Sequence, residues 1–520
     1  AKLRQRAAWV PLRSTHPPFS APAWATFATG MNPGKHGILG FRQHDGRPQS
    51  ILRGEGAIIN SSNIRAPLLW EYFDQAGLTV GSINTPLSYP LRPMRGFGIS
   101  GLLTPPDASD WVQPQSLART LNDYIIDLEY GRPGAPLTLA DLPTPLVFLD
   151  DVMRMTERRG MHTLRIMMTQ PWDALMVVFT GTDRIFHHFW HYLQPTRGNS
   201  GPHLNLAIAD KLRAYFSLLD QILGAMLAKM GAQDTVILLS DHGFGPAARR
   251  WVHPNNWLLE LDLLRLRMSK ASWMQQVKRS APWLSDLAKR VLSPEARKTV
   301  QQHGHLADAV DWSNTLAWSA PIYNNVAGVY LNHAGNASPG PVSPAAAPKL
   351  REFIIQQARK VRIPGTDKPL FMAVQPREAL FRGPHVASFP DIILTMPPYF
   401  AATPTLGATL ITAIPPKQRL RSGDHRPDGM LLAAGPAIRS VRLERPPRLR
   451  DIAPTLLYLA DLPIPKNMDG RVIAALFKGA HWNSRPPRSG PSLPTPPRAN
   501  SLTDEETQAL NDRLRGLGYR

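Results

Sequence analysis

The sequence predicts an α/β fold, and three observations carry this prediction. Two short, continuous apolar runs, 174–179 (ALMVVF) and 235–239 (TVILL), have the length expected of buried strands in a parallel sheet. Between them, residues 204–230 place leucines and a phenylalanine at helical spacing. A strand, a helix and a second strand in this order are the repeating unit of parallel α/β sheets.

Other apolar runs extend the predicted sheet. Further strands are expected at 78–83, 328–331, 391–395 and 430–434. Residues 258–310 differ in composition, with nine basic and two acidic residues between 265 and 298. We expect basic amphipathic helices inserted into the sheet domain. They form either a solvated excursion packed by its tryptophans or a lid or contact for an anionic surface.

The C-terminal part is expected to lie outside the main domain, which we place at 1–482. Residues 483–500 are rich in proline and predict an extended linker. Residues 501–520 predict a short helix, because Thr503 and Glu506 have the spacing of a capping box ahead of Leu510 and Leu514.

Composition narrows the chemistry. The 520 residues include 59 Lys and Arg against 39 Asp and Glu, a net charge of +20, and no cysteine. Cysteine-ligated zinc, iron–sulfur clusters and thiol nucleophiles are therefore excluded. The charge is consistent with an anionic substrate, nucleic acid or an anionic membrane, or with a basic surface that has no such partner. No apolar run reaches the roughly 18 residues of a membrane span.

Acidic residues and histidines follow the predicted strands. Asp183 and His187 come after the first apolar run, four residues apart and thus on one face of a helical turn. Asp241 and His242 come directly after the second, and His425 follows an aspartate in an expected loop before 430–434. Because ligands bind at the carboxyl ends of parallel strands, these pairs indicate a site with carboxylate and imidazole donors, typical of zinc or manganese.

Ser20 is the candidate nucleophile. It opens a segment that reads as a helix with Pro22 in its first turn, where the helix dipole would favour a phosphoryl group. The alternative is that Ser20 serves only as a helix N-cap.

Taken together, the motifs resemble the type I phosphodiesterase/nucleotide pyrophosphatase branch of the alkaline phosphatase superfamily. The matching stretches are RSTHPPFSAPAWATFATGMNPGKHGILGF, NTPLSYPLRPMRGFGISGLLTP, VVFTGTDRIFHHFWHYLQP, VILLSDHGFGP, SGDHRPDGMLLAAGPAI and LRDIAPTLLYLADLPIPKNMDGRVI. The closing LRGLGY is similar to the tail of bacterial members. The resemblance implies an alkaline-phosphatase-like three-layer sandwich, with helices on both faces of a mostly parallel central sheet.

The resemblance also implies two divalent metal ions, usually zinc and sometimes manganese. Asp183, His187 and His425 would hold one ion, and Asp241, His242 and the Ser20 hydroxyl the other. Ser20 would attack phosphorus in line and form a phosphoserine intermediate. The basic residues nearest these positions, considered as substrate contacts or as ordinary surface pairs, are Lys35, Arg184 and Arg426.

The chain departs from the family pattern at three places. The family takes a further metal-binding Asp from a first strand, and no acidic residue precedes Asp45 here. We therefore expect either a chain that lacks this strand, whose given residues need not be active on their own, or a degenerate enzyme. Ser20 and Ala23 stand where nucleotide pyrophosphatases have Thr and Asn. A sulfatase is disfavoured because Trp24 replaces the arginine of the sulfatase signature.

The expected function is hydrolysis of small anionic phosphoric esters, more specifically diesters. Within enzymes, the alternative is a phosphomonoesterase or phosphonate hydrolase on the same scaffold. Outside enzymes, it is a basic protein with a decayed metal site that binds anions or nucleic acid, although nucleic acid is the less favoured partner. The oligomeric state stays open, and so does the compartment, with a slight preference for the cytoplasm.

Overall fold

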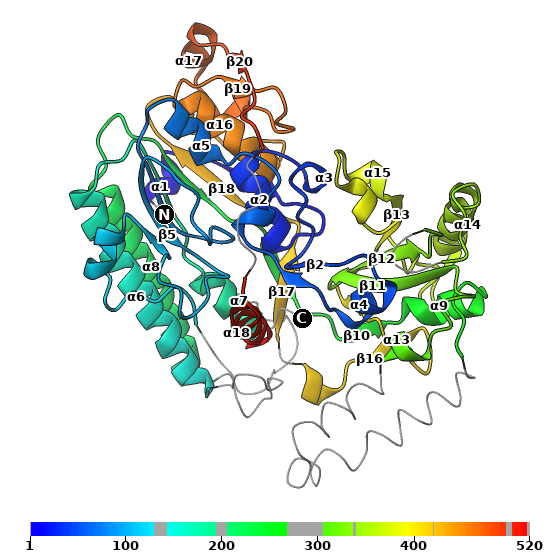
Figure 1. Cartoon of the computed structure of the whole chain (residues 1–520). Coiled ribbons are helices and arrows are strands. Elements are labelled where there is room, and N and C mark those ends of the chain that lie inside the picture. Colours follow the sequence, from blue (N-terminus) through cyan, green and yellow to red (C-terminus); the bar gives the residue numbers. More distant parts are fainter. Residues whose placement is uncertain are drawn as a thin grey trace.

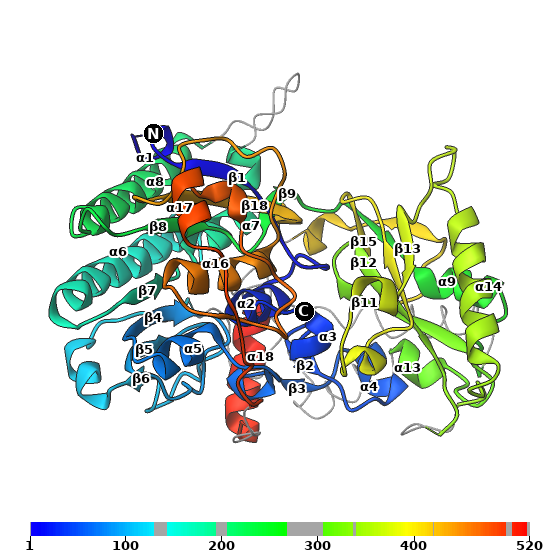
Figure 2. The same cartoon turned by 90° about the horizontal axis from the view of Figure 1, so that it is seen from above.

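The computed structural model describes residues 2–128, 143–193, 205–267, 305–335, 340–419, 421–495 and 502–516. Its elements form two groups that lie side by side in Figure 2. The larger group surrounds β4 (Val80–Thr85) and β18 (Asp428–Ala434), and the smaller surrounds β11 (Ala317–Tyr323) and β12 (Val326–Leu331). Each group has its own buried apolar cluster.

The larger group contains two sheets. Their other strands are β1 (Ala8–Arg13), β5 (Gly96–Ser100), β6 (Val112–Gln113), β7 (Ala174–Val177) and β8 (Val236–Leu239). The strand orders are β6-β5-β4-β7 and β1-β18-β8. Strand β4 pairs in parallel with β5 and β7, whereas β18 pairs antiparallel with β1 and β8. The α/β class is confirmed, and of these two sheets only the first contains parallel pairing.

Helices cover both faces of these strands (Figure 1). The helices that pack together are α6 (Pro145–Thr169), α7 (Gly181–Leu193) and α8 (Leu206–Leu227) on one side, and α2 (Ser20–Thr29), α5 (Leu69–Gln75) and α16 (Ile452–Leu459) on the other. On β4, Val80 joins the cluster of α2, whereas Ile83 joins the cluster of Ile166 from α6. Because these β4 residues are an odd number apart, they face opposite sides, and the predicted three layers are present.

The smaller group is an antiparallel sheet of order β11-β12-β14-β13 with helices against it (Figure 2). Its remaining elements are β10 (Arg250–Val252), α9 (Pro254–Glu260), α13 (Leu306–Ala309), α14 (Ala347–Lys360), β13 (Ala373–Pro376), α15 (Arg377–Leu380), β14 (Ile392–Thr395), β15 (Phe400–Ala402) and β16 (Ile411–Ala413). The predicted basic helices fall mainly on 268–304, outside the described residues, and α9 and α13 lie at either side of that segment.

The C-terminal helix α18 (Asp504–Gly516) packs on the main body. Thr503 and Glu506 form the predicted capping box, with N–H to side-chain oxygen distances of 2.8 and 3.2 Å. Leu510 and Leu514 are buried in the same cluster as α2. The predicted linker contains β20 (Ser489–Gly490), which pairs with β19 (Ile464–Pro465), and its residues 496–500 lie outside the described chain.

Several short elements complete the two groups. They are α1 (Lys2–Gln5), α3 (Pro33–His36), β2 (Arg42–Gln43), α4 (Pro48–Arg53), β3 (Ala57–Ile58) and α17 (Gly479–Ser484), with 3-10 helices at Ser61–Asn63, Gln115–Thr120, Val386–Ser388, Pro416–Gln418, Leu449–Asp451 and Ala474–Leu476. The strands predicted at 78–83, 328–331, 391–395 and 430–434 are confirmed as β4, β12, β14 and β18, and the helix predicted at 204–230 as α8.

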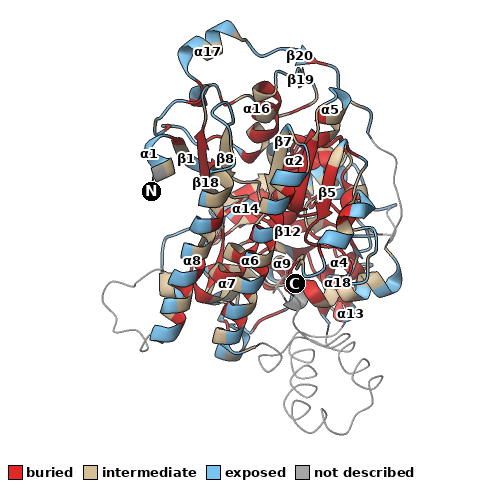
Figure 3. Cartoon of the chain, turned by 90° about the vertical axis from the view of Figure 1, so that its left-hand side faces the viewer, coloured by how far each residue is buried: buried red, intermediate tan, exposed pale blue. Residues whose placement is uncertain are grey.

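Strands β7 and β8 are half-exposed along their whole length, coloured tan in Figure 3. Within the described residues, β7 pairs only with β4 and β8 only with β18, so each strand leaves one edge without a partner. The prediction that both strands are buried is therefore wrong, and the unpaired edges are the physical reason.

Candidate active site

The first pair of site residues lies on α7, which begins three residues after β7 ends. Asp183 is in the first turn of α7 and His187 is one turn further on. Their side chains lie on the same face, with 3.5 Å between His187 Nε2 and Asp183 Oδ1. The predicted helical relation of these two residues is confirmed.

The second pair lies between β8 and β9 (Gly243–Pro246), a strand that the sequence did not suggest. Asp241 and His242 occupy this connection, with Asp241 Oδ2 3.3 Å from His242 Nε2. A side chain at Gly243 would place its Cβ 2.0 Å from the carbonyl oxygen of Asp428. Glycine therefore permits the close approach of β18 that holds this turn.

The third pair is on a strand, where the sequence predicted a loop. Strand β17 (Gly423–Arg426) pairs antiparallel with β9, and His425 lies opposite Phe244. This pairing brings His425 Nε2 to 3.0 Å from His187 Nε2 and to 3.2 Å from Asp183 Oδ1. In consequence, Asp183, His187 and His425 offer ligand atoms within 4.8 Å of one another, a group that could hold a metal ion.

Ser20 is the first residue of α2 and is 5% exposed. Its Oγ lies 3.2 Å from His242 Nε2. The N-cap of α2 is Phe19, so the alternative reading of Ser20 as an N-cap is wrong. The hydroxyl instead lies at the positive end of a ten-residue helix and faces the histidine cluster.

Backbone carbonyls orient the three imidazoles. Each Nδ1 lies at hydrogen-bonding distance from a carbonyl oxygen: Gly423 for His187 (3.1 Å), Pro18 for His425 (3.1 Å) and Gly243 for His242 (3.3 Å). When Nδ1 donates, Nε2 carries the lone pair. All three Nε2 atoms lie within 3.9 Å of Asp183 Oδ1, so the lone pairs converge on one place.

The electrostatics match the protonation states that metal ligation requires. Burial raises the pKa of Asp183, but His187, His425 and Arg184 lower it more, so that this pKa lies well below its usual value. Burial lowers the pKa of His187 well below the ordinary range, and burial with the nearby His242 lowers the pKa of His425 to about 4. At neutral pH the carboxylate is charged and these two imidazoles are neutral.

Asp241 is the least satisfied member of the site. Burial raises the pKa of its carboxyl group. Its Oδ2 is buried and has no hydrogen-bond partner in the described structure. Because a buried carboxylate oxygen without a donor is costly, a cation at this position would stabilise the site. The donor set of carboxylate oxygens and imidazole nitrogens therefore fits a divalent metal.

A family model described as type I phosphodiesterase/nucleotide pyrophosphatase matches residues 1–404. The chain belongs to this family. It is therefore a hydrolase of the phosphodiesterase/nucleotide pyrophosphatase type, which acts on small phosphoesters. The matched span includes Ser20, Asp183 and His242 and ends before His425, which the β17–β9 pairing brings to the same site.

Two solved structures are similar to this chain. Phosphonoacetate hydrolase from Sinorhizobium meliloti 1021, in complex with phosphonoacetate, is 14% identical with a TM-score of 0.45, over 87% of each chain. Murine ectonucleotide pyrophosphatase/phosphodiesterase 5 is 14% identical with a TM-score of 0.41, over 93% of this chain and 92% of its own. No curated protein matches the chain. Among the described residues, no helix combines the length and apolar character needed to cross a membrane.

The three basic residues considered as substrate contacts occupy different places in this family member. Arg184 is buried, with its guanidinium 2.7 Å from both Asp127 and Asp183. Lys35 pairs with Asp469 at 2.8 Å, beyond the C-terminal end of α2. Arg426 lies beside the site and donates to the carbonyl of its neighbour His425. The structure thus brings Arg184 and Arg426 to the cluster and leaves Lys35 outside it.

Tyr323 and Asp127, which the sequence did not single out, support the site together with Asp424, the aspartate of the third predicted pair. The Tyr323 hydroxyl donates to Asp424 Oδ1 at 2.8 Å, and the same oxygen accepts the N–H of His425. The Tyr323 ring stacks between His425 and Phe19, with centroid distances of 5.0 and 4.3 Å. In the sequence, Asp424 was marked by its place in the dipeptide Asp424-His425. No local pattern marks Tyr323 or Asp127, because both act across long sequence separations.

Proposed function

We propose that this family member hydrolyses phosphoric diesters with Ser20 as the nucleophile. The observation that carries the proposal is the contact of the Ser20 hydroxyl with His242, beside a buried cluster of Asp183, His187 and His425. A hydroxyl at a helix N-terminus faces backbone N–H groups and a positive dipole, which favour a phosphoryl group. Hydrolysis of monoesters or phosphonates is the alternative on the same scaffold.

In the proposed reaction, Ser20 Oγ forms a bond to phosphorus while the bond from phosphorus to the leaving alcohol oxygen breaks. The hydroxyl proton leaves Oγ as this bond forms, and the leaving oxygen takes up a proton so that the free alcohol departs. His242, whose Nε2 lies 3.2 Å from Oγ, holds the hydroxyl in place at the site. A water molecule then forms a bond to phosphorus and the Oγ–phosphorus bond breaks. A proton given up by the water returns to Oγ, which restores the free serine. Tyr323 and Arg184 act as positioning residues, because they hold His425 and Asp183 in place.

Two sets of donors would hold divalent metal ions, for which we propose zinc, with manganese as the alternative. Asp183, His187 and His425 form one set, and Asp241, His242 and the Ser20 hydroxyl form the other. Such ions would stabilise negative charge on the phosphoryl oxygens and lower the pKa of a nearby hydroxyl or water. The converging imidazole lone pairs and the donor-free oxygen of Asp241 support this assignment.

The sheet edges support the further proposal that one more strand, from outside the described residues, fits between β7 and β8. Both strands are apolar, half-exposed and unpaired on one edge, and both lead directly into the site. A strand between them would add its own carboxyl-end residues beside Asp183 and Asp241. By the family resemblance, one of those residues would be a metal-binding aspartate.

The proposed function predicts that bis-p-nitrophenyl phosphate is hydrolysed faster than p-nitrophenyl phosphate in the presence of Zn²⁺ or Mn²⁺. Removal of the metal ion with a chelator is expected to abolish turnover, because the buried carboxylates and imidazoles then lack the positive charge of the ion. Return of the metal ion is expected to restore turnover. The rate of p-nitrophenol release by the chain measures both effects. Faster turnover of the monoester would favour the alternative, and turnover unaffected by the chelator would contradict the metal assignment.

A further inference from the structure

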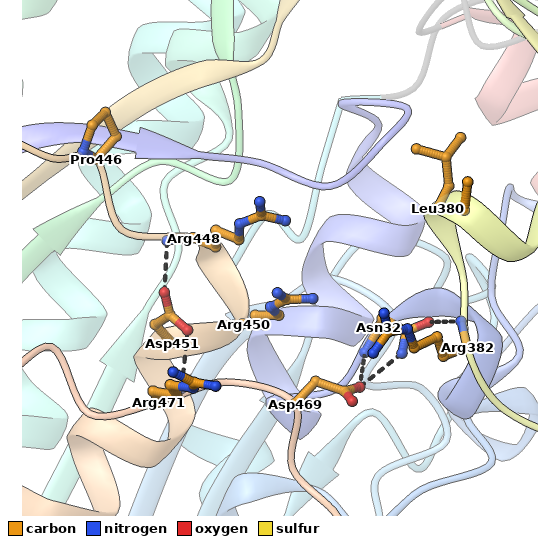
Figure 4. A pocket seen from close by; sticks show the side chains of 10 residues that line it. Asn32, Leu380, Arg382, Pro446, Arg448, Arg450, Asp451, Asp469 and Arg471 are labelled. Atoms are coloured by element: carbon orange, nitrogen blue, oxygen red, sulfur yellow. Dashed lines mark hydrogen bonds between the residues drawn. The ribbon is translucent and has the colours of Figure 1, made fainter. Parts of the chain in front are cut away.

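A pocket rich in arginine lies apart from the histidine cluster (Figure 4). Its volume is about 540 Å³, which is within the size range of small-molecule sites. It is formed where α3, the end of α15 and the segments before and after α16 meet. The lining residues are Asn32, Ala379, Leu380, Arg382, Pro446, Arg448, Arg450, Asp451, Asp469 and Arg471.

The two carboxylates of the pocket are already satisfied by other groups. Asp451 accepts backbone N–H groups of Arg448 (2.8 Å) and Arg471 (3.0 Å). Asp469 accepts the backbone and side-chain N–H groups of Asn32 at 2.9 and 2.8 Å and pairs with Lys35 at 2.8 Å. Within the described residues, neither carboxylate forms an ion pair with a guanidinium group of the pocket. Figure 4 shows the contacts of Asp451 with Arg448 and Arg471 and those of Asp469 with Asn32.

Four arginines line the pocket against two carboxylates. Within the described part of the chain, no ion pair joins the guanidinium groups of Arg382, Arg448, Arg450 or Arg471 to a carboxylate. In Figure 4, Arg448 and Arg450 extend in the same direction, toward the segment that carries Leu380 and Arg382. The Nε of Arg450 is buried without a hydrogen-bond acceptor. Four guanidinium groups that line one pocket create a positive potential that attracts an anion.

The pocket and the Ser20 site lie at opposite ends of α2. Ser20 begins the helix, and Asn32, which caps the following helix α3, lines the pocket. Ten helical residues span about 15 Å. One phosphate group therefore cannot touch Ser20 and this pocket at the same time.

We propose that this pocket is a second, non-catalytic site for an anion with at least two phosphate groups, such as a diphosphate. Guanidinium groups bind phosphate oxygens through paired hydrogen bonds, and several of them together match the charge of a diphosphate. The volume admits more than a single phosphate ion. This assignment does not depend on the role of Ser20.

Calorimetric titration of the full chain with pyrophosphate, in metal-free buffer, tests the proposal. We expect saturable binding that weakens as salt increases, and a loss of about tenfold or more in affinity when Arg448→Ala and Arg450→Ala are combined. Arg445→Ala is the matched control, because Arg445 is exposed on the same segment and does not line the pocket. Its affinity is expected to stay within about twofold of the original chain. If the double variant does not fold, the exposed Arg471→Ala replaces it.

Two further arms separate the possible outcomes. Ser20→Ala is expected to bind pyrophosphate unchanged, and binding that is lost in this variant would place the anion at the catalytic site and overturn the proposal. Vesicles containing phosphatidic acid test whether the phosphate is that of a lipid headgroup. Vesicle binding that depends on Arg448 and Arg450 would assign the site to lipid phosphate. Equal affinity of the original and double-variant chains for both probes would overturn the proposal.

Discussion

Replacement of Ser20 by alanine is expected to reduce diester hydrolysis by about 10³-fold or more, because the variant has no oxygen to form the bond to phosphorus. The small side chain fits the site, and helix α2 keeps its N-cap at Phe19, so the fold is expected to be unchanged. Initial rates with bis-p-nitrophenyl phosphate measure the loss. Acid quenching during turnover, followed by mass spectrometry of the peptide that contains Ser20, is expected to detect a phosphoserine.

Ser20→Thr is the matched control for this prediction. Threonine keeps the hydroxyl at the start of α2 and adds one methyl group, so a substantial part of the activity is expected to remain. If Ser20→Ala keeps the activity of the original chain, the nucleophile assignment is wrong. If Ser20→Ala and Ser20→Thr lose activity equally while the peptide of the original chain carries phosphate, the serine assignment stands and the methyl group is too large for the site.

Replacement of Asp183 by asparagine is expected to remove one metal ion per chain and to reduce hydrolysis by about 10²-fold or more. Asp183 Oδ1 lies within 3.9 Å of the Nε2 atoms of His187, His242 and His425, so it is the shared anion of the cluster. Asparagine keeps the shape of the side chain but removes its charge. Metal content by mass spectrometry and diester turnover measure the two effects.

Asp220→Asn provides the control for the loss of one carboxylate, because Asp220 is exposed on α8 away from the site. Its metal content and activity are expected to equal those of the original chain. Unchanged metal content in Asp183→Asn would contradict the proposed ligand set. Reduced activity with unchanged metal content would assign Asp183 to positioning, through its contact with Arg184, rather than to ligation.

Local sequence patterns predicted the helix α8, the capping box of α18 and the relation of Asp183 to His187. Each of these depends on residues a few positions apart, whose geometry the backbone dictates. The burial of β7 and β8 could not be predicted in this way. Apolar composition shows that a strand is suited to a core, but exposure depends on which strands lie beside it.

The sequence alone determined the α/β class, the types of residue in the candidate site and, by resemblance, the family to which the chain belongs. The resemblance also grouped His425 with Asp183 and His187. Only the tertiary structure decided how they meet, because the β17–β9 pairing connects segments that are far apart in the chain. The tertiary structure also decided that Tyr323 stacks on His425 and that four arginines line one pocket. Distances between distant segments follow from the packing of the whole chain, and no local pattern contains them.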